Sequence, residues 1–470
     1  MTDNRTEGRP KAAPDEVDVA VVGAGLSGLV AGHRLVVAGA SVCVLEARAR
    51  VGGRTLSVPL GAGVADLGGL WISPTQTHVR DLAEELGATM VPQARAGAAV
   101  VADEPGPGRL MRLAGHLELA WRLRTIERLS ARVAAVGVEA VPERWRAASM
   151  GDWLTQVRSR AARAQLDLLV RLHFAAEPGE LSLPFALRGL AASGGLTGSA
   201  AAAGPELCIV GGAQTLAQTL AASLGERVLV NRPVRRIDQS AQRAGQSAQR
   251  AGAVSLLADA GAGRGCCEVR ARFAILAVPP PLTAQIEIFP PLPEACRDLH
   301  RSMRMAPVIK HAFAYERGFW HERGLSGEAY DLGGPVSAVV DHSAVAGVPA
   351  LLAFVVGDAA RLMSDLDPSS QRDIVAGALA ELLGPEAGAP SAHASHDWLR
   401  DPWSAGCVGV LPPSPPARHA HAPVAPVGRL HFAGSERARL WPSYMDGAVE
   451  AGERAAGEVL ARLSGGDNRS

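Results

Sequence analysis

The sequence lacks any continuous apolar run of 18 residues, and its last residues, SGGDNRS, are polar. A helix that crosses a bilayer needs about 20 apolar residues, so we expect neither a membrane anchor nor a membrane partner. The N-terminal stretch MTDNRTEGRPKAAPDE is polar and charged and has no apolar core of the signal-peptide kind. We therefore expect two tails outside the fold, a disordered one at 1–15 and a short one at 466–470.

The sequence also lacks an excess of charge of either sign, because its 47 lysine and arginine residues are balanced by 47 aspartate and glutamate residues. Nucleic acids and anionic membrane surfaces attract strongly basic proteins, so neither is an expected partner. The six cysteines include the adjacent pair Cys266 and Cys267 and show no spacing of a metal site or a disulfide framework. This usage is typical of the reducing cytoplasm, and we expect a cytoplasmic protein without a metal.

A nucleotide-binding pattern stands near the start of the chain. Residues 17–22 form a short apolar run rich in β-branched residues, which is typical of a buried parallel strand. Gly23, Gly25 and Gly28 follow at GxGxxG spacing. They allow, in turn, a tight turn, the approach of a pyrophosphate to the backbone, and close packing of the next helix on the strand. The spacing alone is a weak signal, and a glycine-rich turn without a ligand is the alternative.

The residues after the glycines strengthen this pattern. A helix is predicted to begin at Leu26 and Ser27, and its free N–H groups and partial positive charge favour a phosphate. Residues 41–45 are predicted to form the next strand, which ends at Glu46 and Ala47. An acid about 20 residues after the glycines accepts ribose hydroxyls and repels a 2′-phosphate. Strand, glycines, helix, strand and acid in this order predict an adenosine dinucleotide that is not NADP-like.

Two arginines and two further glycines come next. Arg48 opens the segment RARVGGRT, and Arg54 follows Gly53. An arginine after a glycine pair can bind a pyrophosphate through two hydrogen bonds; a solvated surface charge is the alternative, more so for Arg48. The stretch 66–76 then brings two glycines whose backbone can approach a flat ring, with an ordinary loop as the alternative. Its candidate cofactor contacts are Gly68, Gly69, Leu70 and Trp71.

A second stretch, 430–456, lies near the other end of the chain. It reads LHFAGSERARLWPSYMDGAVEAGERAA, which predicts a short strand, a turn and an amphipathic helix. Together with the first stretch it resembles the GR2-type FAD-dependent family that includes the flavin monoamine and polyamine oxidases. The resemblance implies FAD as the cofactor, with the N-terminus of the last helix facing the flavin and stabilising its anionic reduced ring. It adds as cofactor contacts Val234, Gly434, Ser435, Glu436 and Met445.

The resemblance also implies an α/β fold of two interleaved domains, which suits a chain of 470 residues that is too long for one core. We expect a Rossmann-like FAD-binding domain with a doubly wound parallel sheet, built from 16–89, 206–285 and 396–465. A substrate-binding domain with a mixed sheet and helices is expected from 90–205 and 286–395. The polar segment SAQRAGQSAQRAG, 240–252, is interpreted as an extended hairpin tip.

One lysine, Lys310, stands in the apolar, strand-like run 306–313. A buried ammonium is costly, so this position needs a partner or a purpose. A lysine on the wet face of an edge strand is the alternative. In the resembling oxidases the lysine at this place holds a water against the flavin and attracts the superoxide that forms with O2, so the resemblance makes Lys310 a candidate catalytic residue.

Cys407 comes nine residues after Trp398 and directly after a glycine. This arrangement resembles the covalently flavinylated monoamine oxidases, in which the cysteine sulfur is bonded to the flavin. The resemblance makes Cys407 a candidate attachment point and Trp398 a candidate catalytic residue. A small buried thiol is the alternative for Cys407.

The next position departs from the family. The monoamine oxidases have an aromatic cage of two tyrosines beside the flavin; here Val408 replaces one, and the other is retained as Tyr444, one of three tyrosines in the chain. The resemblance gives Tyr444 contacts with both substrate and cofactor, and the half-open cage indicates a bulkier or differently shaped substrate. His173 and Phe174 fall on the family's cavity segment, although a structural role is the alternative for the histidine.

These residues predict an FAD-dependent oxidase that converts an amine to an imine, which hydrolyses to an aldehyde or ketone, while O2 is reduced to H2O2. No acid–base triad is visible, and none is required, because the flavin accepts the hydride and the protein orients the amine. The second hypothesis is a tailoring or catabolic flavoenzyme that oxidises an amino acid, an amide or a C–C bond; an arginine that faces the cavity would favour an amino acid. The third is a flavin-stabilised interaction protein. The substrate and a homodimer are left open.

Overall fold

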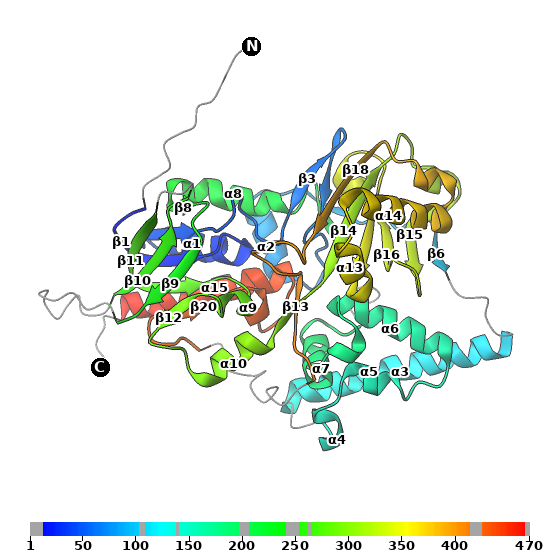
Figure 1. Ribbon diagram of the computed structural model, residues 1–470, viewed down its shortest axis with the longest axis horizontal. Helices are drawn as coiled ribbons and strands as arrows, with labels where there is room; N and C mark the ends of the chain where they lie inside the picture. Colours follow the sequence, from blue (N-terminus) through cyan, green and yellow to red (C-terminus); the bar gives the residue numbers. More distant parts are fainter. Residues whose placement is uncertain are drawn as a thin grey trace, which may run out of the picture.

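The computed structural model describes residues 13–102, 109–137, 141–196, 206–240, 253–261, 265–413 and 425–465. Of the segment 240–252, interpreted as an extended hairpin tip, all but Ser240 lies outside the described residues, as do most of the N-terminal tail and the last five residues. Two sheets lie on opposite sides of the molecule, and a helical layer lies beside the second sheet (Figure 1).

The first sheet contains the strand that was predicted before the glycines. Its parallel part runs in the order β8, β2, β1, β11, β20. Alternate side chains of β1, such as Val19 and Val21, pack with α1, α2, α8 and α15. These elements are β1 Glu16–Val22, β2 Val42–Leu45, β8 Val228–Leu229, β11 Cys266–Leu276, β20 Leu430–Phe432, α1 Leu26–Val37, α2 Thr77–Glu85, α8 Gln214–Leu224 and α15 Met445–Ser464.

The opposite face of this sheet is covered by strands. Ala20 and Val22 of β1 belong to an apolar cluster with residues of β9 and β10, and both strands continue the sheet from β11 in antiparallel pairing. The predicted α/β class is therefore confirmed, with an antiparallel extension where a second helical layer was expected. The added elements are β9 Val234–Asp238, β10 Val254–Asp259, β12 Glu287–Phe289, α9 Pro280–Thr283 and α10 Glu294–Ser302.

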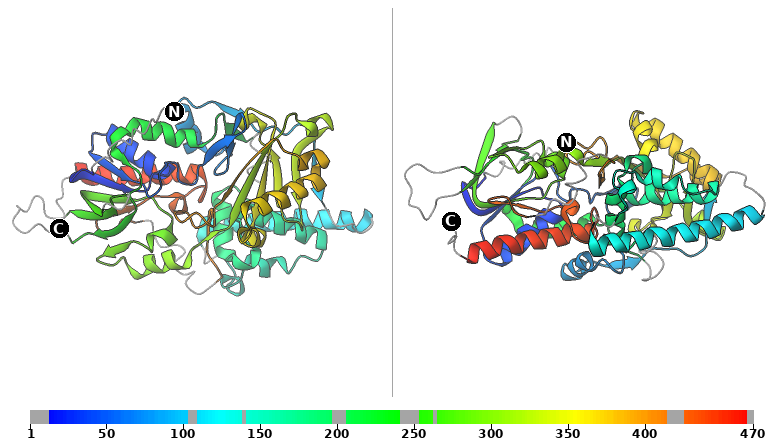
Figure 2. Two further views of the ribbon diagram at one scale, coloured as in Figure 1. Left: turned by 45° about the horizontal axis from the view of Figure 1, so that its top comes forward. Right: turned by 90° about the horizontal axis from the view of Figure 1, so that it is seen from below.

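The second sheet runs in the order β18, β14, β17, β16, β15, β6. One face packs on α13 and α14, and the other packs on a cap formed by α3, α5, α6 and α7, of which Figure 2 shows the long helix α3 along one side. The strands are β6 Ala98–Ala102, β14 Val308–Ala314, β15 Leu325–Asp331, β16 Ala338–Asp341, β17 Ala350–Val356 and β18 Ala392–Asp397. The helices are α3 Arg109–Val136, α5 Met150–Leu154, α6 Arg160–Phe174, α7 Leu183–Ala192, α13 Gly357–Ser364 and α14 Pro368–Leu383.

Short elements connect the two sheets. They are β3 Ser57–Leu60, β4 Gly63–Asp66, β5 Met90–Pro92, β7 Leu207–Ile209, β13 Arg304–Ala306, β19 Val408–Val410, α4 Glu143–Arg146, α11 Phe319–Glu322 and α12 Ser343–Ala346. None of the helices in the described ranges combines the length and the apolar content that crossing a membrane requires.

Strand pairing differs from the predicted domain boundaries at two places. β12 pairs with β9 of the first sheet, although the boundary was expected before it, at 285. β18 pairs with β14 of the second sheet, whereas the boundary expected at 396 cuts through this strand. Both strands are short or only half-buried, so their own apolar pattern does not tell which sheet they join.

Candidate active site

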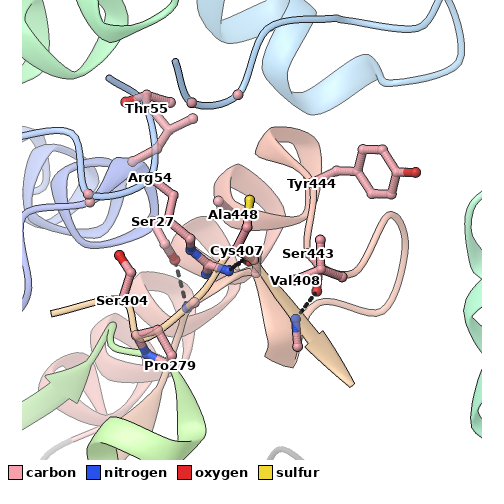
Figure 3. A pocket seen from close by; sticks show the side chains of 18 of the residues that line it. Ser27, Arg54, Thr55, Pro279, Ser404, Cys407, Val408, Ser443, Tyr444 and Ala448 are labelled. Carbon is pink, nitrogen blue, oxygen red and sulfur yellow. Dashed lines mark hydrogen bonds between the residues drawn. The ribbon is translucent and has the colours of Figure 1, made fainter. Parts of the chain in front are cut away.

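A cavity of about 500 Å³ lies between the two sheets. Small-molecule sites commonly measure roughly 300–1,000 Å³. The lining includes the turn after β1, the loops after β2 and β4, strands β14 and β17, and the start of α15. Figure 3 shows Arg54 from the loop after β2, together with Tyr444 and Ala448 at the start of α15. The predicted site residues that line it are Gly23, Gly25, Leu26, Ser27, Glu46, Ala47, Arg48, Gly53, Arg54, Gly68, Gly69, Leu70, Trp71, His173, Phe174, Val234, Lys310, Cys407, Val408, Gly434, Ser435, Tyr444 and Met445.

The three glycines after β1 meet three different steric demands. Gly23 has a φ of +101°, which side chains rarely adopt. A Cβ on Gly28 would lie 2.0 Å from the carbonyl oxygen of Gly23, so this glycine lets α1 pack on the turn. A Cβ on Gly25 would meet only Gly53, whose Cα is 3.8 Å away. The protein itself thus leaves the space over Gly25 open toward the cavity, as a cradle for a phosphate requires.

Glu46 stands at the carboxyl end of β2 and is buried. Its Oε2 accepts a hydrogen bond from the backbone N–H of Ala24 at 2.7 Å, and Oε1 accepts one from the N–H of Arg48 at 2.9 Å. Backbone donors therefore fix the carboxylate at the rim of the cavity, where its remaining lone pairs can accept hydroxyl groups. This placement fits the ribose contact that the sequence predicts.

A buried ion pair joins the two ends of the chain beside the cavity. Arg54 Nη1 and Nη2 donate to the two carboxylate oxygens of Glu436 at 2.5 and 2.9 Å, and Nη2 also donates to Ser435 Oγ at 3.0 Å. Burial opposes both charges, but the partner overrides it: the pKa of Arg54 is raised and that of Glu436 is lowered. A second tie is the hydrogen bond from the N–H of Gly434 to Ser27 Oγ at 2.9 Å.

Arg48 is also paired within the protein. Its guanidinium donates to Asp401 at 2.7 Å and to Ser404 Oγ at 2.6 Å. The exposed fraction of the side chain is 11% for Arg48 and 21% for Arg54. The alternative of a solvated surface charge is therefore wrong for both arginines, while their contact with a pyrophosphate stays a prediction.

Gly68 and Gly69 line the cavity, but the chain itself explains why they are glycines. A Cβ on Gly68 would lie 2.1 Å from the carbonyl oxygen of Arg54, and one on Gly69 would lie 2.9 Å from Met445 Sδ. The sequence interpretation assigned both to the approach of a flat ring. The structure corrects the reason: backbone and side-chain atoms of neighbouring segments already fill the space at these glycines.

Lys310 projects from the middle of β14, an inner strand whose seven residues are all buried. Its Nζ donates to the carbonyl oxygen of Gly68 at 2.5 Å and lies 4.6 Å from the ring centre of Phe354. Burial lowers the pKa of Lys310 to about 8, although Cys407 and Asp66 oppose this shift. The alternative of a wet edge strand is wrong, because β14 is paired on both sides.

Cys407 lies in the cavity at the start of β19 and is one of six free cysteines. Burial raises the pKa of its thiol, whereas the positive charges of Arg54 and Lys310 act in the opposite direction. A thiolate is the reactive form of cysteine. The two cations act toward the thiolate that attachment to a flavin requires, but burial outweighs them, and the attachment itself stays a prediction.

Val408 stands where the monoamine oxidases have the second tyrosine of their aromatic cage, but Tyr444 has other aromatic neighbours. Its ring centre lies 5.2 Å from that of Trp441 and 6.0 Å from that of His173. Val408 lines the same cavity from β19, and Tyr444 lines it from the turn directly before α15 (Figure 3). Burial lowers the pKa of His173 to about 4, so its imidazole is neutral near pH 7.

Three predicted site residues do not line the cavity. Gly28 and Glu436 support residues that do line it: Gly28 lets α1 pack on the turn at Gly23, and Glu436 pairs with Arg54. Trp398 is fully buried, and its indole N–H donates to the carbonyl oxygen of Leu67 at 2.7 Å. The structure therefore gives Trp398 a supporting position rather than contact with a substrate, which corrects its expected catalytic role.

Some lining residues were not predicted. Phe354 stands opposite Lys310 on β17, and no local motif marks it. Glu206, the residue directly before β7, also lines the cavity. Trp441 belongs to the segment WPSYMDG, so its closeness to Tyr444 in the sequence was a usable signal.

Comparison with known proteins identifies the family of this chain. Residues 26–460 match the family described as flavin containing amine oxidoreductase. AofH of Mycobacterium tuberculosis, whose name places it with the flavin-containing monoamine oxidases, is 34% identical over 96% of this chain and 98% of its own. Putrescine oxidase bound to putrescine superposes with a TM-score of 0.82, 29% identical over 95% of this chain and 99% of that one. Cyclohexylamine oxidase from Brevibacterium oxydans superposes with a TM-score of 0.83 and is 27% identical over 96% of this chain and 100% of that one. The chain belongs to the flavin-containing amine oxidoreductases.

Proposed function

We propose that this protein is an FAD-dependent oxidase that converts an amine to an imine, with O2 as the electron acceptor and H2O2 as the second product. The observation that carries the proposal is that one cavity contains both the dinucleotide turn and the pair Lys310 and Tyr444. Binding of a nucleotide alone requires neither of these two side chains. Their presence therefore argues against a flavin-stabilised interaction protein.

The residues at the turn fit FAD. The open space over Gly25, the fixed carboxylate of Glu46 and the first turn of α1 offer, respectively, room for a pyrophosphate, an acceptor for ribose hydroxyls, and free N–H groups. The start of α15 at Met445 presents the positive end of a second helix to the same cavity. When bound, FAD supplies the acceptor for the hydride of the amine.

The chain's own side chains bind and orient the amine. An apolar wall around Tyr444 favours the neutral amine over the ammonium, because burial disfavours the charged form. His173 is neutral near pH 7 and adds no competing cation. Lys310 keeps a positive charge below about pH 8, which attracts the anion formed when O2 takes up an electron.

An amino acid as substrate has less support. A carboxylate is usually bound by an arginine, and the arginines that line the cavity within the described residues are Arg48, Arg54, Arg232 and Arg235. All four belong to the nucleotide-binding segments rather than to the cap, and the first two already pair with carboxylates. We therefore place oxidation of an amino acid, an amide or a C–C bond second.

Covalent attachment of the flavin through Cys407 and a reducing, cytoplasmic location are further parts of the proposal. Arg54 and Lys310 act on the thiol in the direction that attachment needs. All six cysteines are free, as expected for a reducing compartment. Acid precipitation tests the first part: yellow colour in the pellet supports attachment at Cys407, and colour in the supernatant contradicts it.

Anaerobic titration of the purified yellow protein with a panel of amines tests the main proposal. We expect at least one amine to bleach the flavin absorbance, and O2 to restore it with formation of H2O2. A flavin that dithionite reduces but no amine bleaches would contradict an amine oxidase and favour the second hypothesis.

A further inference from the structure

The part of the cavity that faces the cap contains few polar groups. We call the part lined by α6, α7, Leu196 and Glu206 the substrate end. The polar side chains of this lining are His173, on α6, and Glu206, just before β7. The other contributors are apolar: Leu169, Leu172, Phe174, Phe185 and Leu196.

The hydrogen bonds around His173 fix its tautomer. Ser193 Oγ donates to the carbonyl oxygen of Gly189 at 2.9 Å, so only its lone pairs remain for His173 Nε2, at 3.2 Å. Nε2 therefore carries the proton, and in a neutral imidazole Nδ1 is then an acceptor. No residue in the described part of the chain hydrogen-bonds Nδ1, and Nδ1 is not among the enclosed unpaired atoms. His173 itself lines the cavity, so this acceptor belongs to its wall.

Glu206 brings a carboxylate whose charge is incompletely balanced. Its Oε2 accepts from Arg95 Nη2 at 2.8 Å, and the same guanidinium lies 3.3 Å from Glu328. Two carboxylates thus share one cation, and the cation is the most exposed of the three, at 39% against 14% for each acid. The charge of Glu206 also reaches Tyr444, because it contributes, after burial, to the raised pKa of that phenol.

Two acceptors on an otherwise apolar wall select a matching ligand. A buried acceptor that meets no donor costs free energy, so a purely alkyl group is a poor fit beside His173 and Glu206. A carboxylate is a poorer fit, since it would face the charge of Glu206 directly. A hydroxyl group satisfies one acceptor, and an ammonium group both donates hydrogen bonds and offsets the negative charge.

We propose that the substrate end binds a second hydrogen-bond donor on the amine substrate, through Glu206 and His173 Nδ1, and that the preferred substrates are aliphatic diamines. This inference rests on the proposed amine oxidase activity and names its substrate class. The oxidised amine lies near Tyr444, while the other amino group, as an ammonium, lies against Glu206.

Linear amines of equal length test this proposal. We would measure kcat/KM for 1,4-diaminobutane, 4-aminobutanol, butylamine and 4-aminobutyrate, and for the six-carbon series. The diamine of at least one series should exceed the alkylamine about 10- to 100-fold, because one charged hydrogen bond differs between them. The amino alcohol should fall between them, and the amino acid should be last.

The variant E206Q keeps the shape of the side chain and removes its charge. We expect it to lose at least about 10-fold in kcat/KM for the diamine, mainly through KM, with little change for the alkylamine. The matched control is E386Q, which removes a carboxylate that pairs with Arg323 on the surface, outside the cavity. It should leave the ratio between diamine and alkylamine unchanged.

The outcomes separate the two proposals. Equal rates for diamine and alkylamine, or an E206Q variant that slows all amines alike, would overturn the substrate class while leaving the amine oxidase intact. A flavin that none of these amines bleaches would overturn the amine oxidase and the substrate class together. Loss of the diamine preference in S193A, where the proton of His173 is no longer held on Nε2, would support the part assigned to the imidazole.

Discussion

At the nucleotide end of the cavity, around Gly25, Glu46 and Arg54, hydrogen bonds and an ion pair hold segments from opposite ends of the chain together. At the substrate end, side chains of the cap helices form an apolar wall. The first is crowded by its own atoms, with Gly28 and Gly68 packed against carbonyl oxygens. At the second, hydrogen bonds hold His173 and Glu206 among apolar neighbours. From this contrast we expect the nucleotide end to determine which cofactor binds, and a few side chains at the substrate end to determine which amine is preferred.

The sharpest test of the nucleotide end compares Gly25 and Gly28, two glycines of the same motif. G28A places a Cβ against the carbonyl oxygen of Gly23, and we expect a loss of about 3 kcal/mol or more of stability or a failure to fold. G25A meets no such clash and should fold normally but bind FAD weakly. Thermal unfolding of both variants, with FAD release followed by fluorescence, checks the pair. Equal stability of the two would contradict the steric assignment.

The ion pair between Arg54 and Glu436 is the next largest effect. E436Q leaves a buried guanidinium without its counter-ion, and such losses cost about 3–5 kcal/mol. Chemical unfolding measures the difference. The surface substitution E386Q, which also removes a carboxylate from an arginine pair, serves as the control and should cost little, because solvent screens exposed pairs. A cost as small as that of the control would show that the pair does not clamp the two segments.

Lys310 lines the cavity that contains both the nucleotide end and the substrate end. Its replacement should affect two half-reactions differently: reduction of the flavin by the amine and its reoxidation by O2. K310M should slow reoxidation of the reduced flavin by O2 about 100-fold, because a charge near the reacting oxygen is lost, and should change reduction by the amine less. Since the pKa of Lys310 is lowered to about 8, the cation is present below that pH and lost above it. Wild-type reoxidation should therefore slow as the pH rises through about 8, and K310M should lack this step. Stopped-flow absorbance measures both.

The smallest effect concerns the half-open cage. V408Y adds a second aromatic side chain to the cavity next to Tyr444 and should shift preference toward small aromatic amines by about 10-fold or less. The ratio of kcat/KM for benzylamine to that for an aliphatic amine is the readout. An unchanged ratio would mean that Trp441 and His173, the present neighbours of Tyr444, already complete the cage.

The sequence predicted the parts of the molecule whose constraints are local. Gly23, Gly25 and Gly28 stand in a fixed order because turn, phosphate and helix packing each need one of them at a set distance along the chain. Lys310 was recognisable because it is one charged residue in an apolar, strand-like run, where burial of a charge is costly. These constraints depend on neighbours in sequence, so a single chain displays them.

Contacts between distant segments were not predictable in this way. The partner of Arg54 stands more than 350 residues away at Glu436, and any acid at that end would have matched the pattern equally well. Trp398 kept the family's spacing while its ring turned toward Leu67 and away from the cavity. Glu206 belongs to a segment without periodicity or motif, so only the fold brings its carboxylate to the substrate end. The sheet that β12 or β18 joins is likewise decided by pairing and not by composition.

Of the 47 lysine and arginine residues in the chain, two are lysines, at 11 and 310. Aldehydes, which follow from hydrolysis of an imine, condense with unprotonated amino groups to form Schiff bases. An enzyme that releases aldehydes would thus have two lysine side chains whose amino groups can attack them, and of these Lys310 lines its own cavity. Because the pKa of Lys310 is lowered to about 8, this amine is partly unprotonated in mildly alkaline solution. Slow self-inactivation during turnover should start at this one residue, and borohydride reduction would trap it as a single cross-link between product and protein.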